Sequence, residues 1–72
     1  MKELLKFLIE NRTLVRFTEI EQAIGLTERE VMSLINRAKV MFNNEPKFKF
    51  AEEGAVIMIG NTLSVKKYLG IV

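Results

Sequence analysis

Apolar residues recur with the period of an α-helix in three stretches of the first 44 residues. In residues 1–11 they cover about 200° of a helical wheel, wider than the stripe of roughly 100° that a surface helix buries. Residues 18–24 give a short second helix, and residues 27–44 give a longer third one with an apolar arc of about 120°. The pattern therefore predicts three helices whose core positions are Met1, Leu4, Leu5, Phe7, Leu8, Ile9, Ile20, Ala23, Ile24, Val31, Leu34, Ile35, Ala38, Met41 and Phe42.

Two helix starts with one helix stop between them lie in the middle of this region. Thr27 fits a capping box with Glu30, in which the Thr side chain accepts from the N3 amide and the Glu side chain accepts from the cap amide. The same spacing relates Thr18 to Glu21. Gly25 stands where the second helix ends, a position that usually takes a left-handed backbone. Because one residue separates Gly25 from Thr27, the two helices must cross at a sharp angle, which is typical of a helix-turn-helix.

The period changes from 3.6 to 2 after Pro46, which ends the third helix by forcing the preceding residue away from helical geometry. Residues 47–50 read Lys-Phe-Lys-Phe, a strict alternation that indicates a half-buried strand with its lysines outside. Residues 51–54 form a turn, and residues 55–59 return as a second strand. The sequence thus predicts a two-stranded hairpin over residues 47–59.

Two further segments lie outside the three helices and the hairpin. Residues 14–17 suit a short extended segment. Residues 60–72 form a C-terminal segment, in which residues 62–69 fit a short last helix that ends at Gly70. Because the chain has 72 residues and contains no linker, we expect a single domain over residues 1–72.

The stretch from Ile20 to Ile35 resembles the helix-turn-helix of small bacterial and archaeal winged-helix regulators. Those proteins show an apolar residue, two polar residues and Ala, then an apolar-Gly-apolar-Ser/Thr turn and a Val-x-x-x-apolar helix. This chain reads Ile-Glu-Gln-Ala-Ile-Gly-Leu-Thr and continues through Val31. The likeness extends over residues 3–59, about four-fifths of the chain. It implies an α+β winged helix, in which a three-helix helix-turn-helix core precedes a two-stranded β-hairpin called the wing.

The chain lacks several of the residue types on which most enzymes depend. The chain has no His and no Cys, and all of its 9 acidic residues are Glu, so Asp is absent as well. The usual general base at neutral pH, the commonest metal ligand and the usual carboxylate of a hydrolytic triad are therefore missing. We expect a protein that is not an enzyme and that has no cofactor, no metal site and no small-molecule effector.

Charge and hydropathy limit the cellular location and the binding partners that we expect. No apolar run approaches the roughly 20 residues of a membrane span, and nothing resembles an export signal, so we expect a soluble cytoplasmic protein without membrane association. The formal net charge is +2, which neither requires nor excludes nucleic acid. Its excess lies in the last third of the chain, where four lysines oppose two glutamates: Lys47, Lys49, Lys66 and Lys67 against Glu52 and Glu53.

The resemblance implies a surface for double-stranded DNA. In the family, the third helix enters the major groove and the wing contacts the flanking backbone or minor groove. Arg suits guanine and Asn suits adenine, because each makes two hydrogen bonds to one base edge. We therefore expect a sequence-specific DNA-binding protein that regulates transcription. Carried onto this chain, the family's arrangement assigns DNA contacts to the cap and polar face of the third helix and to the first wing strand: Thr27, Arg29, Ser33, Asn36, Arg37, Lys47 and Lys49.

Acidic residues favour a different function. Glu28 and Glu30 lie in the first turn of the third helix, where phosphate would repel them. The predicted wing tip is also acidic, since it carries Glu52 and Glu53. The main alternative is therefore a winged-helix module that binds a partner protein without DNA, and a weaker one is an architectural or replication-associated binder with little sequence preference. The lysines of the first wing strand also fit protection of an exposed strand edge.

Hydrophobic residues make up 49% of the chain, more than one small core covers. The wide apolar stripe of residues 1–11 and the apolar tail within residues 60–72 favour a homodimer formed through the first helix and the C-terminal segment. The symmetric pair would present its two third helices to half-sites about 34 Å apart. The competing arrangement is a tail that folds back onto the first helix of the same chain.

Overall fold

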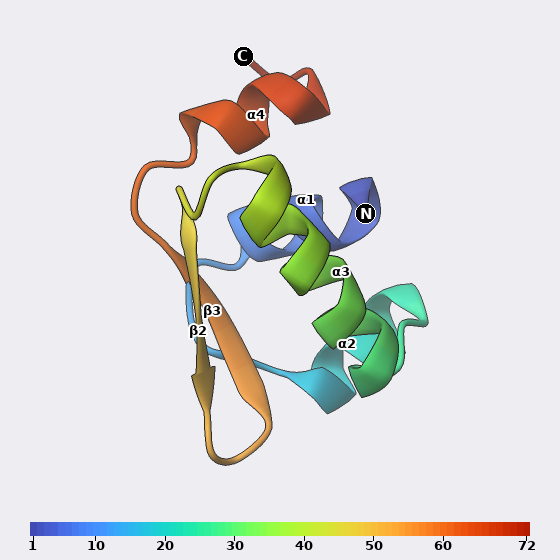
Figure 1. Ribbon diagram of the computed structural model, residues 1–72. Helices are drawn as coiled ribbons and strands as arrows, with labels where there is room; N and C mark the ends of the chain where they lie inside the picture. Colours follow the sequence, from blue (N-terminus) through green and yellow to red (C-terminus); the bar gives the residue numbers. More distant parts are fainter.

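The helices and strands of the computed structural model, which describes residues 1–72, form an α+β domain (Figure 1). The strands make one antiparallel sheet in the order β1-β3-β2. The predicted winged-helix architecture, three helices followed by a two-stranded hairpin, is wrong, because the structure has a third strand and a fourth helix. In chain order the elements are α1 (Lys2–Glu10), β1 (Val15–Arg16), α2 (Phe17–Ile24), α3 (Glu28–Met41), β2 (Lys47–Ala51), β3 (Ala55–Ile59) and α4 (Leu63–Leu69).

The third strand comes from the segment between the first two helices. Val15 pairs with Val56 and Arg16 pairs with Ala55, so β1 lies along the side of β3 that β2 leaves free. The sequence pattern predicted an extended segment here but no partner for it. A strand of 2 residues has too few alternating positions to show which face it buries. Burial of both valines of the first pair stabilises this pairing.

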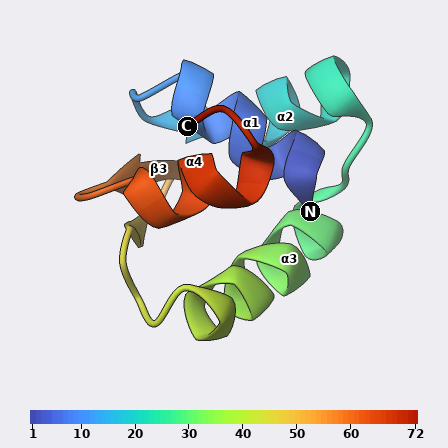
Figure 2. The same ribbon diagram turned by 90° about the horizontal axis from the view of Figure 1, so that it is seen from above.

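The fourth helix, α4, corresponds to the short last helix expected at residues 62–69, and it ends at Gly70, whose φ is 78°. Val65 is fully buried, and the Tyr68 ring meets the Phe42 ring edge-on with 5.6 Å between centroids. α4 packs on α1 within the same chain (Figures 1 and 2). The wide apolar stripe of α1 is therefore covered by α2, β3 and the chain's own tail. A tail folded back onto the first helix is the arrangement that the sequence offered as the alternative to a dimer.

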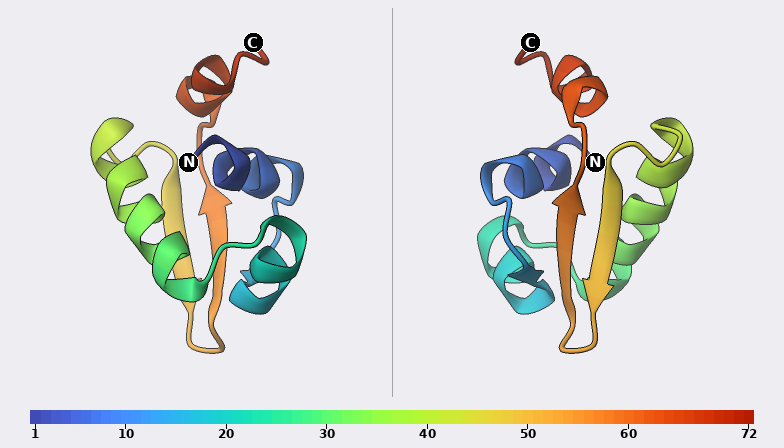
Figure 3. Two further views of the ribbon diagram at one scale, coloured as in Figure 1. Left: turned by 90° about the vertical axis from the view of Figure 1, so that its right-hand side faces the viewer. Right: turned by 90° about the vertical axis from the view of Figure 1, so that its left-hand side faces the viewer.

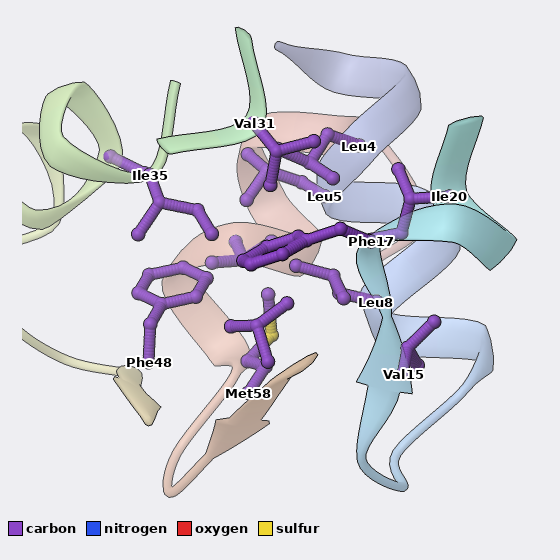
Figure 4. Close-up of a cluster of buried hydrophobic side chains, with 13 residues drawn as sticks. Leu4, Leu5, Leu8, Val15, Phe17, Ile20, Val31, Ile35, Phe48 and Met58 are labelled. Carbon is purple, nitrogen blue, oxygen red and sulfur yellow. The ribbon is translucent and has the colours of Figure 1, made fainter. Parts of the chain in front are cut away.

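One face of the sheet is covered by helices and the other is open. Phe48, Val56 and Met58 are buried on the covered face, and Figure 4 shows Phe48 close to Ile35 of α3. We call this the inner face. In the right-hand view of Figure 3, no helix lies in front of β2 and β3. Residues that alternate with Phe48, Val56 and Met58 along these strands have their side chains on this face, because successive strand residues point to opposite sides. We call this the open face of the sheet.

The core confirms most of the predicted apolar positions. Leu8, Ile20 and Val31 are fully buried in one cluster that all three first helices share with the sheet. Two predicted positions are wrong, since Ala23 is exposed and Met41 exposes 47% of its surface. The cluster consists of Leu4, Leu5, Leu8, Val15, Phe17, Ile20, Val31, Ile35, Ala38, Phe48, Val56, Met58 and Val65.

The start of α2 differs from the predicted one. Phe17 begins the helix because its ring is buried and its backbone N–H donates to a carbonyl in the hairpin turn at 2.9 Å. Glu19 then becomes the N3 residue, and its carboxylate accepts from the backbone N–H of Arg16 at 3.1 Å. The predicted capping box of Thr18 with Glu21 is therefore wrong, because the helix already begins at Phe17, one residue before the predicted cap residue Thr18.

The end of α3 also differs from the predicted one. The helix stops at Met41 and not at residue 44. Asn43 and Asn44 follow with φ values of 59° and 60°, a left-handed conformation that Asn tolerates better than most residues. The two asparagines therefore turn the chain out of the helix before Pro46 is reached.

Candidate nucleic-acid interface

The turn between α2 and α3 has the geometry that the sequence predicted. Gly25 has a φ of 74°, in the left-handed region that favours glycine, and its N–H donates to the carbonyl of Glu21 at 2.9 Å. Thr27 already caps α3, so the chain leaves one helix and enters the next within a few residues. This turn fixes the direction in which α3 leaves α2.

The capping box of Thr27 and Glu30 is confirmed. The Glu30 N–H donates to the Thr27 hydroxyl oxygen at 3.2 Å, and the Thr27 N–H donates to the Glu30 carboxylate at 3.0 Å. The hydroxyl also donates to that carboxylate at 3.1 Å. The bonds from the backbone and then from the hydroxyl of Thr27 lower the pKa of Glu30, because they stabilise its charged form. The Thr27 hydroxyl, which the sequence assigned to DNA, is thus occupied by the helix's own cap.

The outer face of α3 brings together the polar residues that the sequence assigned to DNA. Arg29, Ser33, Asn36 and Arg37 are all exposed. They fall within about 100° on one side of the helix, opposite the buried stripe that contains Ile35. We call this stripe of four residues the α3 outer face. It presents two guanidinium groups, one amide and one hydroxyl to solvent on a rigid element.

The acidic residues of the first turn lie beside the α3 outer face and not within it. Glu28 and Glu30 each stand about 100° round the helix from Arg29, on opposite flanks. Glu30 is turned back onto the helix start by its cap bonds. Glu28 is exposed, and its carboxylate accepts no cap bond of the kind that accounts for Glu30 in the first turn. Val40, which exposes 81% of its surface, ends the stripe at the C-terminal side.

Lys39 adds a cation that the sequence analysis did not single out. Its Nζ lies 5.4 Å from the centre of the Phe50 ring, so this side chain projects from α3 towards β2. Lysine stems often lie along apolar surface with the ammonium group near solvent. Residue 39 lies between the polar and apolar arcs of the helix, and only the position of the hairpin shows what it faces.

Lys47 and Lys49 lie on the open face of the sheet, whereas α3 packs against the inner face. Both are exposed and alternate with Phe48, which is buried below α3. The structure therefore does not join them to the α3 outer face in one stripe. It places them instead with Arg16 of β1, which pairs with β3 from the other side of the sheet. This grouping was not predictable from the sequence, because nothing in the pattern showed which strand β1 would pair with.

Comparisons of the chain with protein-family models, with curated proteins and with solved structures found no match. No helix has the length and apolar character needed to cross a membrane. No group of three or more His, Cys, Asp or Glu side chains is placed to hold a metal ion, and the surface has no pocket.

Proposed function

We propose that the protein binds double-stranded DNA sequence-specifically by inserting the outer face of α3 into the major groove. We further propose that it is a cytoplasmic protein and that it regulates transcription. The observation that carries this proposal is the stripe of Arg29, Ser33, Asn36 and Arg37, displayed on a helix that a sharp turn and a capping box orient. An α-helix with its side chains is about 10–12 Å across, and the major groove is about 12 Å wide. A helix presented in this way fits that groove.

The side chains of the α3 outer face match the chemistry of base edges and phosphates. Arg29 and Arg37 each offer a planar fork of donors for the two acceptors of guanine, and Asn36 offers a donor and an acceptor for adenine. Ser33 can bond to either a base or a phosphate. Lys39, on the flank that faces the hairpin, suits a phosphate, because phosphate contacts need charge but no fixed geometry.

We propose that two copies act together on DNA through α1 and the C-terminal segment. α4 covers the buried side of α1, so the surface left for a partner is the outer side of the tail. Ile71 and Val72 expose 55% and 68% of their surfaces, and Tyr68 is exposed beside Lys2 of α1. A symmetric pair would place two α3 helices at half-sites about 34 Å apart. Sedimentation at high micromolar concentration tests this, and a monomer there contradicts it.

The test of DNA binding is fluorescence anisotropy on a mixed-sequence duplex at about 50 and 200 mM salt. A DNA-binding protein has non-specific affinity that falls steeply over this range, because bound cations release counterions. Arg29→Ala with Arg37→Ala should weaken binding to this duplex about a hundredfold at 50 mM salt, because two fewer bound cations release roughly two fewer counterions. Lys47→Ala with Lys49→Ala removes the same number of exposed cations from β2, so it is the matched control and should change the affinity less than about threefold. Absence of binding at 50 mM salt contradicts the proposal.

The second candidate function is a protein-interaction module that uses the same helix. Val40 exposes 81% of its surface at the end of the α3 outer face, and Met32 exposes 36% on its flank. Glu28 on the same flank adds a charge that DNA disfavours. If the duplex fails to bind while Val40→Ser removes binding of a partner protein, this candidate replaces the first.

A further inference from the structure

The open face of the sheet carries two flanks of cations and an apolar strip between them. Ile57 and Ile59 of β3 are half-buried in the centre. Lys47 and Lys49 pair with Ile59 and Ile57 from the β2 side. The open-face position on the β1 side is Arg16, opposite Ala55. No carboxylate occupies an open-face position in any of the three strands.

Arg12 extends the cationic flank beyond the end of β1. Its Nε donates to the carbonyl of Met58 at 3.1 Å, and a terminal nitrogen lies 3.4 Å from the carbonyl of Gly60. The guanidinium thus bonds to the edge of β3 where the two-residue strand β1 no longer reaches. These two bonds fix its position and leave further N–H donors of the five that Arg carries.

The spacing of the flanks matches the width of a helix. Neighbouring strands lie about 4.8 Å apart, so the lysines of β2 and the arginine of β1 stand two spacings, or roughly 10 Å, from each other across β3. An α-helix is about 10–12 Å across. A helix lying along β3 would therefore rest on the two isoleucines with a row of cations on either side. A helix on a sheet is also the usual way in which proteins cover such a face.

The charges and side-chain types select among possible occupants. A second copy of this chain placed symmetrically on the open face would oppose cation to cation, which disfavours it. Single-stranded nucleic acid gains its affinity from aromatic platforms, and the open face has none, because Phe48 and Phe50 belong to the other face. A partner that carries acidic groups on both sides of an apolar stripe would satisfy both the cations and the isoleucines.

We propose that the open face of the sheet docks an amphipathic helix of a partner protein whose apolar stripe is flanked by Glu or Asp. The apolar stripe covers Ile57 and Ile59, while the acidic flanks face Lys47 and Lys49 on one side and Arg16 with Arg12 on the other. This docking does not depend on DNA binding by α3, because the two surfaces share no residue.

The test is a titration of the ¹⁵N-labelled protein with a synthetic helical peptide that has a Leu stripe and Glu on both flanks. Amide shifts should concentrate on β1, β2, β3 and Arg12, and binding should weaken severalfold between 50 and 300 mM salt. A scrambled peptide of the same composition is the control for charge alone, and it should bind at least about tenfold more weakly because it has no stripe. Equal binding of the two peptides, or the absence of amide shifts at 1 mM peptide, overturns the proposal.

Charge reversal on the protein tests whether the peptide binds at the open face or at another part of the surface. Lys47→Glu with Lys49→Glu should weaken peptide binding at least about tenfold, since attractive pairs become repulsive. Lys66→Glu with Lys67→Glu makes the same change of charge on α4 and should have little effect. Loss of binding in the α4 variant but not in the β2 variant contradicts the proposal. Duplex DNA that shifts the open face more than the α3 outer face would show a nucleic-acid surface instead.

Discussion

The α3 outer face and the open face of the sheet are both exposed and both carry cations, yet they are built in different ways. The α3 outer face is made by residues close together in the sequence and is oriented by Gly25 and Thr27. The open face joins residues 12–16 to residues 47–59 through strand pairing. One mixes cations with neighbouring glutamates and hydrogen-bonding groups, whereas the other mixes cations with apolar side chains.

The difference between the two surfaces corresponds to different partners. Base edges require donors and acceptors in defined places, which the Arg, Asn and Ser side chains of α3 supply. A surface of cations around an apolar strip has no such pattern and suits a partner that is itself acidic and apolar. Changes that disturb one surface and spare the other therefore test whether they act separately.

The largest expected effect comes from weakening the strand pair that builds the open face. Val15→Ala removes two buried methyl groups from β1 and should lower the free energy of unfolding by about 2 kcal/mol, or roughly 10 °C in Tm. Leu14→Ala, at the exposed neighbouring position, should change it by less than about 0.5 kcal/mol. Denaturant unfolding measures both values. Similar losses in the two variants would mean that β1 is not held by the burial of Val15.

The next effect comes from the turn that orients α3. Gly25→Ala forces a Cβ into a left-handed backbone and should cost about 1–2 kcal/mol of stability. Gly54→Ala is a matched control in the turn between β2 and β3, because its φ is 77° and an added Cβ would lie 3.7 Å from the Phe17 ring, an ordinary contact distance. Both variants should lose similar stability, but only Gly25→Ala should weaken DNA binding. Equal loss of DNA affinity in both would contradict a specific role for the turn.

A smaller effect is expected at the cap of α3. Thr27→Ala removes the acceptor of the Glu30 N–H and should cost about 1 kcal/mol. Thr18→Ala is the control, since the structure places Thr18 inside α2 and not at its cap. It should change stability by less than about 0.5 kcal/mol. Thermal unfolding of the two variants compares the confirmed capping box with the one that the structure rejects.

The smallest effect is the pH dependence of the same cap. The pKa of Glu30 is lowered in the folded protein, so the unfolded chain binds this proton more readily than the folded one does. The stability that Glu30 contributes is therefore fully present above the ordinary Glu pKa of about 4.3 and is lost as the pH falls through the lower folded value. Urea unfolding of the wild type and Glu30→Gln should give a difference that shrinks towards acid pH. A difference that grows on acidification contradicts the cap bonds.

The parts of the fold that follow from local chemistry were predictable from the sequence. The turn at Gly25, the cap at Thr27 and the alternation of residues 47–50 each need only a few neighbouring residues, and all three are confirmed. The pairing of Val15 with β3 was not predictable, because two residues give no periodicity. The early end of α3 was not predictable either. Pro46 is the obvious helix-ending residue in the sequence, whereas the structure ends the helix earlier, at two asparagines with left-handed backbone.

The residues of the candidate site also fall into two groups, one predictable from local sequence and one dependent on long-range packing. Arg29, Ser33, Asn36 and Arg37 share one side of α3 because helical periodicity alone places them there. Lys39 and the arginines of the open face depend on where the hairpin lies against α3 and β1, which is a long-range property. For the same reason, the family resemblance assigned DNA contacts to Lys47 and Lys49 as well as to the third helix, whereas the structure places these lysines on the face of the sheet away from α3.

The most direct test of the account measures duplex affinity in two double variants side by side. Anisotropy with one mixed-sequence duplex at 50 mM salt should show a loss of about a hundredfold for Arg29→Ala with Arg37→Ala, because two cations that release counterions on binding are removed. Lys47→Ala with Lys49→Ala removes the same number of cations from the open face and should change the affinity less than about threefold. The reverse order, or equal losses in the two variants, would contradict the claim that α3 and not the sheet contacts DNA.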